Sequence, residues 1–189
     1  MKIRVFDYGA GNLHSLLRVL RESAEEVTIS ADLSDLSPGE LLFLPGVGAF
    51  GHAAQRLAPF RDPVRAAVAD GMAVFGICLG MQLLFDRSEE GPGPGLGLIA
   101  GDVVRLRTQR LPHMGWNEVS GGHGWAYFAH SFVCLPKDPS VVQTWSTHEG
   151  VGFAATVRAG RVGGAQFHPE KSGAAGAAFL RAQLQELAS

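Results

Sequence analysis

Short apolar runs alternate with amphipathic segments through the first half of the chain. Four runs predict strands, at residues 3–6, 26–29, 41–44 and 73–75, and the first of them is expected to be buried. Three segments between and after them predict helices, at residues 13–20, 63–69 and 79–85. Strands that alternate with helices in this way predict a mostly parallel sheet with helices on both faces.

The pattern changes after residue 87. Residues 88–97 are rich in glycine and proline and show no apolar period, which predicts a mobile loop. Short β-type runs follow at residues 103–106, 125–128, 132–135, 141–145, 153–157 and 162–167, and an amphipathic helix is predicted at 174–187. No repeat and no long linker divides the chain. We therefore expect one α/β domain over residues 1–189, with a central, mostly parallel (mixed) sheet.

Composition narrows the classes of function. The chain has 189 residues, 46% of them apolar and 18% charged, and its net charge of −2 comes without a dense Lys/Arg cluster, so we expect no nucleic-acid partner. The first residues are too charged for the apolar region of a signal peptide, and no 18-residue apolar run predicts a membrane span. The two cysteines form no CxxC pair, which favours a reducing cytoplasm in which a thiol stays free.

A candidate nucleophile lies between the strand at 73–75 and the helix at 79–85. Gly76-Ile77-Cys78-Leu79-Gly80 has the Gly-x-Cys-x-Gly order of a nucleophile elbow, a tight turn whose flanking residues must be small. At the first turn of a helix, unpaired N–H groups favour the thiolate of Cys78, and the Leu79 N–H points to where an oxyanion would form. A buried core cysteine in a glycine-rich turn explains this motif alone equally well.

A candidate base and its orienting carboxylate lie near the C-terminus, in Gln166-Phe167-His168-Pro169-Glu170. Proline favours an extended residue before it, so His168 and Glu170 should project to one side, about 7 Å apart at the backbone. The carboxylate can then hold one imidazole nitrogen while the other faces a nucleophile. Taken alone, a His two residues from a Glu is usually a solvated strand end. Because both motifs end predicted strands, their joint occurrence favours a triad with Cys78 at one sheet edge.

The remaining cysteine and most histidines have no catalytic pattern. Cys134 lies inside an apolar run and is expected in the core. Surface or packing roles are expected for His14, His52, His113, His123 and His148. No His/Cys pair has the spacing of zinc ligands, so we expect no metal and no other cofactor.

Together these motifs resemble a known family. Residues 76–82 with His168-Pro169-Glu170 resemble the class I (triad) glutamine amidotransferases, which implies their flavodoxin-like fold. Further segments resemble one branch of that family, the glutaminase subunits of imidazole glycerol phosphate synthase in histidine biosynthesis. These segments are residues 7–13 (DYGAGNL), 45–50 (PGVGAF), 95–99 (GLGLI), 113–117 (HMGWN), 127–132 (YFAHSF) and 166–172 (QFHPEKS). The resemblance covers nearly the whole chain.

The resemblance implies a role for each matched residue. Cys78 would attack the side-chain amide of L-glutamine to give a γ-glutamyl thioester and ammonia, while His168 moves the protons and Glu170 orients it. The residues implied to hold the oxyanion are Leu79, Gly46, Val47 and Gly48, of which the last three belong to a loop that shifts when the partner binds. The residues implied to hold the glutamine are Gln82, Glu90, Ser131 and Phe132. Without the resemblance, Gln82 would be interpreted as an exposed helix residue.

The resemblance also implies a partner protein. The ammonia would pass through a channel to a (β/α)8 synthase subunit. Nothing in this sequence resembles that barrel, so the synthase would be a separate chain and the complex a heterodimer. The residues implied to lie near the contact are Asn12, Trp116, Tyr127 and Lys171. For Trp116, ordinary core packing is an equally good interpretation.

Three other functions stay open at this point. A glutaminase of another pathway, such as anthranilate, guanylate or pyridoxal phosphate synthesis, would share the triad, although the segments at 7–12 and 113–117 favour the histidine pathway. A γ-glutamyl hydrolase or cysteine peptidase of the same fold would be active alone, whereas we expect low glutaminase activity until a partner binds. A non-catalytic binding module would keep the fold, but a complete set of triad residues argues against it.

Overall fold

Seven strands form the central sheet of the protein, for which the computed structural model describes residues 1–9 and 13–188. In spatial order they are β10 (Val142–His148), β11 (Val151–Ala159), β12 (Val162–Ala165), β4 (Ala73–Ile77), β3 (Glu40–Leu44), β1 (Lys2–Phe6) and β2 (Glu26–Ser30). The strands from β12 to β2 are parallel, and β11 and β10 extend the sheet antiparallel. The parallel part has the strand order of flavodoxin-like folds. The predicted mostly parallel, mixed sheet is confirmed.

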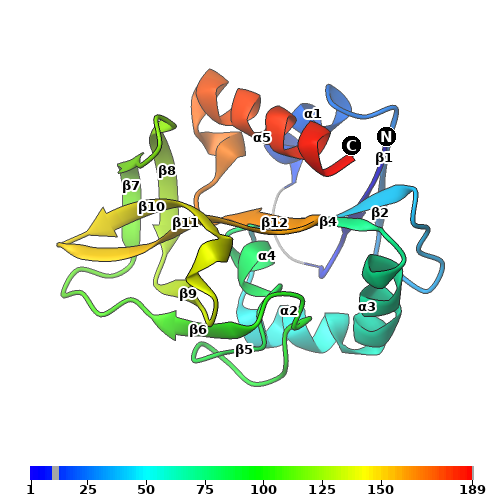
Figure 1. Ribbon diagram of the computed structural model, residues 1–189, viewed down its shortest axis with the longest axis horizontal. Coiled ribbons are helices and arrows are strands. Elements are labelled where there is room, and N and C mark those ends of the chain that lie inside the picture. The colour runs from blue at the N-terminus through cyan, green and yellow to red at the C-terminus, as the bar shows by residue number, and fades with distance from the viewer. Residues whose placement is uncertain (10–12, 189) are drawn as a thin grey trace.

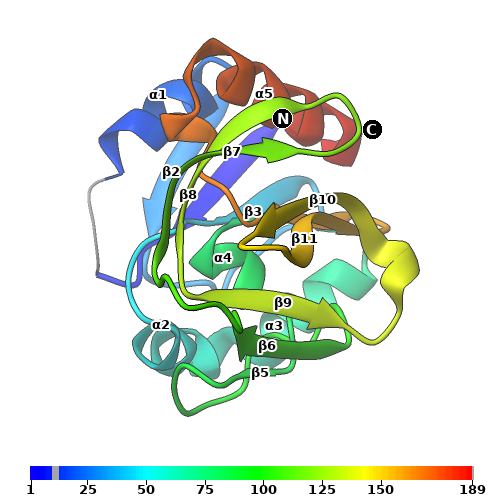
Figure 2. The same ribbon diagram turned by 90° about the vertical axis from the view of Figure 1, so that its left-hand side faces the viewer.

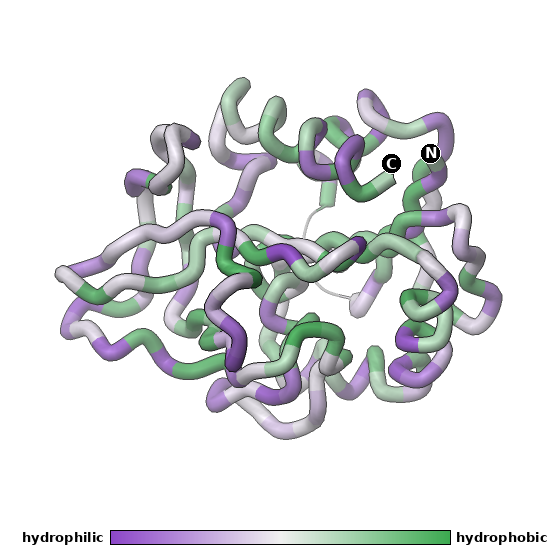
Figure 3. The backbone as a smooth tube through the Cα atoms, viewed as in Figure 1, coloured by the Kyte–Doolittle hydropathy of each residue, from purple (hydrophilic) through white to green (hydrophobic). Residues whose placement is uncertain are grey.

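Helices cover both faces of this sheet (Figure 1). One face carries α1 (His14–Arg21) and α5 (Gly173–Ala188), and the other carries α2 (Phe50–Leu57), η1 (Ala58–Phe60), α3 (Arg61–Ala69) and α4 (Leu79–Gln82). In β3, Leu41 and Phe43 belong to the apolar core beneath α1 and α5, whereas Leu42 and Leu44 belong to the core beneath α2 and α3. This alternation is the strand period of two, and it makes the central strands apolar on both sides. Figure 3 shows the hydropathy of each residue along these strands.

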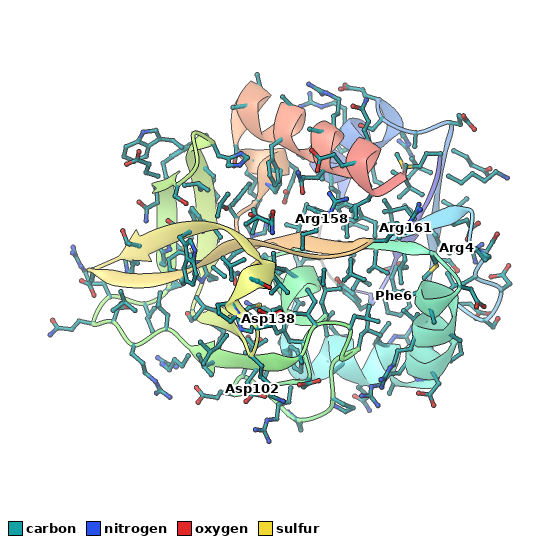
Figure 4. All side chains as sticks on the ribbon, in the orientation of Figure 1. Arg4, Phe6, Asp102, Asp138, Arg158 and Arg161 are labelled. Atoms are coloured by element: carbon teal, nitrogen blue, oxygen red, sulfur yellow. The ribbon has the colours of Figure 1, made fainter. Side chains whose placement is uncertain are left out.

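α5 is fixed to the sheet by an apolar face and by an ion pair. Leu180, Leu184 and Leu187 are buried in the core shared with α1. Arg158 of β11, labelled in Figure 4, donates from Nη1 to Glu186 Oε2 at 2.8 Å. The helix predicted at 174–187 is therefore confirmed. Within residues 1–9 and 13–188, no helix is long and apolar enough to span a membrane.

Two smaller sheets flank β10 and β11 (Figure 2). One is the antiparallel hairpin of β7 (His113–Val119) and β8 (Gly124–His130). In the other, β6 (Gly101–Arg105) pairs with β9 (Phe132–Pro136) and with β5 (Arg87–Ser88). Only Ser131 separates β8 from β9, so the chain passes directly from the hairpin into the second sheet; η2 (Pro139–Val141) then leads into β10.

The sequence pattern predicts neither α2 nor β7, and it also misses the two-residue strand β5 and the 3-10 turns η1, η2 and η3 (Pro169–Lys171). α2 has a regular apolar face that includes the buried Phe50 and Leu57, but it is short and has Gly51 in its first turn. In β7 the exposed positions carry Met114 and Trp116, which are 63% and 54% exposed. Because apolar residues face solvent there, the usual alternation of buried apolar and exposed polar residues is lost.

α4 ends at Gln82, three residues before the predicted end of that helix. The backbone after it pairs with a later segment instead of continuing the helix: Leu96 N donates to Leu83 O at 2.7 Å, and similar bonds follow at the next residues. The segment predicted as a loop, residues 88–97, thus returns to the end of α4. Arg61 Nε also donates to the carbonyl of Gly95 at 2.8 Å. The mobility of this segment stays a prediction.

Gly80 sets the contact between α4 and β3. A Cβ at this position would lie 1.9 Å from the carbonyl oxygen of Leu44, and a backbone atom of a central strand cannot rotate away. We expect Gly80→Ala to lower the free energy of unfolding by at least about 3 kcal/mol, measured by urea denaturation. Gly152→Ala in β11 is the control, because a Cβ there meets no atom within 4 Å. Equal losses in the two variants would contradict the role of this close approach.

Candidate active site

Cys78 lies in a strained turn between β4 and α4. Its backbone φ is 47° and its ψ is −105°, a conformation that a non-glycine residue keeps only when its surroundings enforce it. A Cβ on Gly76 would lie 2.3 Å from the carbonyl carbon of Gly80, so both glycines are needed for the chain to turn this tightly. The Cys78 N–H donates to Ala165 O at 2.7 Å and ties the turn to β12. The turn has the form of a nucleophile elbow.

The helix that begins at Cys78 is short. Cys78 occupies the N-cap position, as the sequence predicts, but α4 has only four residues. The helix macrodipole is a sum over aligned peptide groups. The one turn of α4 therefore offers Cys78 its adjacent N–H groups and little of the field of a long helix.

His168 and Glu170 are in contact, although the chain between them is not extended. His168 Nδ1 lies 2.8 Å from Glu170 Oε1, and both side chains are nearly fully buried. His168 itself is extended, but η3 (Pro169–Lys171) is a 3-10 turn, so the predicted extended path to Glu170 is wrong. Proline at the first position of the turn explains the difference, because its fixed φ suits a helical turn.

The charges around His168 set its protonation state. Burial lowers the pKa of the imidazole, because it penalises the charged form. The hydrogen bonds and negative charges of Cys78 and Glu170 more than offset this penalty and raise the pKa of His168 to about 9. An imidazolium between a sulfur and a carboxylate can hand its proton to a leaving amine.

Ser172 holds the backbone of His168 in place. Its hydroxyl donates to His168 O at 2.7 Å and accepts from Tyr127 N–H at 2.9 Å, while His168 N–H donates to Tyr127 O at 2.8 Å. The backbone of β8 is thereby bonded twice to the segment that carries the imidazole. No sequence signal other than proximity to His168 points to Ser172.

A cavity of about 100 Å³ opens beside Cys78. The residues that line it are Gly46, Gly48, Cys78, Leu79, Gln82, Glu90, Ala129, His130, Ser131 and Phe132. Val47 is not among them, and its side chain packs against the apolar core. His168 borders the same loop, because a Cβ on Gly46 would lie 3.1 Å from His168 Cε1. The structure thus brings the predicted nucleophile, oxyanion loop and glutamine-binding residues to one place.

Gln82 and Glu90 already have protein partners in this cavity. Gln82 is 4% exposed and donates from Nε2 to Phe132 O at 3.1 Å, so the interpretation as an exposed helix residue is wrong. One Glu90 carboxylate oxygen accepts from Phe50 N–H at 3.0 Å, at the start of α2. The carboxylate caps that helix and still borders the cavity.

Two buried polar contacts escaped the sequence analysis. The Tyr8 hydroxyl donates to Pro45 O, at the start of the predicted oxyanion loop. Gln166 is fully buried, and its Nε2 lies 3.6 Å from Cys78 Sγ. Alternation places residues 166 and 168 on one side of an extended chain, which is the one signal that could have indicated Gln166.

The other cysteine and the histidines predicted to have no catalytic role are either buried in packing contacts or exposed at the surface. Cys134 is buried in the core, as predicted. His113 is buried and stacks on His148, with ring centroids 4.2 Å apart. His14, His52 and His123 are exposed. In the described part of the chain, no group of three or more His, Cys, Asp or Glu residues is arranged to hold a metal ion.

Three of the four residues predicted at the partner contact form an aromatic cluster on the surface. Trp116 and Tyr127 pack edge to face with ring centroids 6.3 Å apart, and Lys171 Nζ lies 5.9 Å from the centroid of the Tyr127 ring. Trp116 is 54% exposed, so core packing does not explain it. Asn12 lies outside the described residues.

The protonation of His168 can be measured directly. We expect an NMR titration midpoint near pH 9 for His168, and a lower midpoint in Cys78→Ala and in Glu170→Gln, because each variant removes a group that raises the pKa. The pKa of His130, which burial lowers to about 3, provides an internal reference. Since the folded pKa of His168 exceeds the ordinary value of 6.5, its protonation stabilises the fold fully below pH 6.5, and this is lost as pH rises through 9. A His168 midpoint below 6.5 in the unmodified chain would refute this electrostatic account.

Comparison with known proteins identifies relatives of this chain. The family described as Glutamine amidotransferase class-I matches residues 4–187. Imidazole glycerol phosphate synthase subunit HisH from Natronomonas pharaonis is 45% identical, over 95% of this chain and 92% of its own length. HisH from Halobacterium salinarum is 46% identical, over 95% and 90%, and HisH from Thermotoga maritima is 43% identical, over 98% and 97%.

Solved structures show the same fold. The crystal structure of a glutamine amidotransferase is 20% identical to this chain, covers 98% of it and matches it with a TM-score of 0.69. The structure of PurLQS from Thermotoga maritima is also 20% identical, covers 98% of the chain and matches it with a TM-score of 0.74. Each likeness also covers 98% of the other chain, so it spans the full α/β architecture. With the family match and the high coverage of the HisH relatives, the chain belongs to the class I glutamine amidotransferases, in the branch of the HisH subunits of imidazole glycerol phosphate synthase.

Proposed function

We propose that this chain is a glutaminase subunit that hydrolyses L-glutamine and delivers the ammonia to a synthase subunit making imidazole glycerol phosphate. One observation carries the proposal: a cysteine on a strained elbow shares a buried site with a His–Glu pair, and a small cavity opens at the cysteine. The HisH relatives favour the histidine pathway over the anthranilate, guanylate and pyridoxal phosphate pathways.

The proposed reaction uses the triad in two steps. The Cys78 thiolate attacks the side-chain amide carbon of glutamine, and the His168 imidazolium gives its proton to the departing nitrogen, which leaves as ammonia. The γ-glutamyl thioester that remains is attacked by water, from which His168 takes a proton, and glutamate leaves as the sulfur is released. Glu170 holds the imidazole in one orientation through its Nδ1.

Backbone N–H groups stabilise the charge that develops on the amide oxygen. Leu79 N–H belongs to the first residue of α4, and Gly46 and Gly48 line the same cavity as Leu79. Gly48 has a φ of 105°, which a residue with a side chain rarely adopts, so this loop depends on glycine to present its backbone.

Glutamine is held at the far end of the cavity by charge and by backbone. Glu90 offers a carboxylate to the α-amino group of the substrate, and the backbone of Ser131 and Phe132 lines the same space.

The partner binds at the aromatic cluster of Trp116, Tyr127 and Lys171. An exposed aromatic pair with a cation beside it is the composition of an interface hot spot. By resemblance the partner is a (β/α)8 synthase subunit, the complex is a heterodimer, and Asn12 contributes to the same contact. A free nucleophilic thiol requires a reducing compartment, for which we propose the cytoplasm.

Removal of the nucleophile should separate the two nitrogen sources of the complex. In Cys78→Ala reconstituted with the synthase subunit, we expect glutamine-dependent synthesis to fall by at least about 10³-fold, because no thioester forms. Synthesis from added ammonia should persist, since that route bypasses the thiol. Cys134→Ala is the matched control and should keep both activities, because Cys134 is a buried core residue. Glutamine use retained in Cys78→Ala would overturn the proposal.

Removal of the exposed indole should weaken the complex. We expect Trp116→Ala to raise the Kd for the synthase subunit by about 30-fold, or about 2 kcal/mol, measured by titration calorimetry. Trp145→Ala serves as the control, because Trp145 is similarly exposed at 47% but lies on β10, outside the aromatic cluster. The interface assignment fails if the control variant binds as weakly as Trp116→Ala.

A further inference from the structure

We propose that Gln166 is a positioning residue for the nucleophile: its side-chain amide donates a hydrogen bond to Cys78 Sγ and is held in that orientation by Gln82 and the Phe132 carbonyl. This inference rests on the proposed function, since it concerns the same thiol. It assigns a role to a glutamine that lies outside the triad and does not line the cavity.

Three contacts make a continuous chain from β9 to the sulfur. Gln82 Nε2 donates to Phe132 O at 3.1 Å and to Gln166 Oε1 at 3.5 Å. Gln166 Nε2 then lies 3.6 Å from Cys78 Sγ. Gln82 and Gln166 are 4% and 0% exposed, so water does not compete for these amides.

The Phe132 carbonyl fixes the orientation of both amides. A carbonyl oxygen only accepts, so the Gln82 atom that faces it must be the NH2 group. That NH2 group also faces Gln166, which must therefore present its oxygen to Gln82. The NH2 group of Gln166 is left to point at Cys78 Sγ, where it can only donate.

A second buried chain supports the same carbonyl from the hairpin. His130 Nδ1 lies 3.0 Å from Phe132 O, so this nitrogen carries the proton, and His130 Nε2 accepts from His113 Nδ1 at 3.0 Å. Asn117 Nδ2 lies 3.3 Å from His113 Nε2 and completes the sequence of donors. Burial lowers the pKa of His130 to about 3 and that of His113 to about 4, so both stay neutral and the chain keeps its direction at neutral pH.

The sulfur has a partner in each protonation state. As a thiol it donates toward Ala129 O at 3.8 Å, and as a thiolate it accepts from Gln166. A hydrogen bond to the charged form increases the fraction of thiolate and aims the sulfur. Gln166 therefore acts on the nucleophile through the Cys78 sulfur and not through the substrate.

The other titratable groups near the sulfur are His168, His130, Tyr8, Cys134 and Glu90. Burial raises the pKa of Tyr8 and of Cys134 well above their ordinary values, so both stay neutral over the working range. His168 is present in every variant considered below. A change in the pH profile on substitution of Gln166 therefore reports on the lost donor.

The test is the pH dependence of iodoacetamide alkylation of Cys78 in the full chain, followed by peptide mass spectrometry. Gln166→Met keeps the length of the side chain but removes the donor, and we expect the half-maximal pH of alkylation to rise by about one unit. Gln166→Glu replaces the donor by an acceptor and should shift it further. In the complex, kcat for glutamine at pH 7 should fall about tenfold in Gln166→Met, with KM changed less than about twofold.

Thr156→Val is the matched control. Thr156 is a buried polar residue bonded to Thr144 at 2.7 Å, and it pairs across the sheet with Ala165, the residue before Gln166. Its loss therefore reports the cost of an apolar replacement in the same part of the core without removing the amide that faces the sulfur. We expect this variant to keep the alkylation profile of the unmodified chain. An equal shift in Thr156→Val would overturn the inference, because it would attribute the effect to loosened packing.

A variant that misfolds does not remove the test. Thermal unfolding and ammonia-dependent synthesis in the complex report whether each variant is folded, and Gln82→Met provides a second route, since it removes the group that orients Gln166. A smaller shift in the same direction is expected for Gln82→Met. If all folded variants keep the original profile, the inference fails while the proposed function stands. If the unmodified Cys78 does not react with a glutamine-analogue electrophile, the proposed function fails first.

Discussion

The backbone of Cys78 is held at a φ of 47° by contacts that leave no room for side chains on either flanking glycine. Such a conformation costs of the order of 1–3 kcal/mol, and the surrounding structure must supply that energy. It does so through Gly80, which lies directly against the Leu44 backbone, and through the hydrogen bond from Cys78 N–H to Ala165. The two central strands on either side of β4 therefore determine where the sulfur lies.

The second requirement of the proposed mechanism is a base fixed at the same sheet edge. The imidazole of His168 is fixed from two sides: by the Glu170 carboxylate and by the backbone bonds among Ser172, Tyr127 and His168. β8 thus carries an aromatic ring at the surface, on Tyr127, and the carbonyl that accepts from His168 N–H. Tyr127, in the proposed partner contact, is thus joined to His168 by a single backbone hydrogen bond, which gives a partner a short physical route to the site.

Polar groups inside the protein are arranged so that one carbonyl oxygen orders several side chains. Phe132 O faces donors from Gln82 and His130, and each of these is bonded onward, toward the sulfur or toward the hairpin. Buried donors and acceptors without partners are costly, so a network of this kind has few alternative arrangements. Under the proposed function, such a network orders the nucleophile and the neighbouring pocket before the substrate arrives.

The sequence alone determined the layered α/β fold, because apolar periods of two and of helical type are local properties of the chain. It also determined the nucleophile candidate, since the small residues around Cys78 follow from the geometry of a tight turn, and the His–Glu pair, which is only two residues apart. The tertiary structure alone decided the burial of Gln82 and Gln166, whose partners lie 50 and 88 residues away in the chain. It also decided that α4 stops at Gln82, because the carbonyls of residues 83–85, which follow the helix, accept from the backbone of residues 96–99. It decided as well that Trp116 faces solvent, from a strand that carries apolar residues at exposed positions. Contacts between distant segments set burial and hydrogen-bond partners, and no local pattern contains that information.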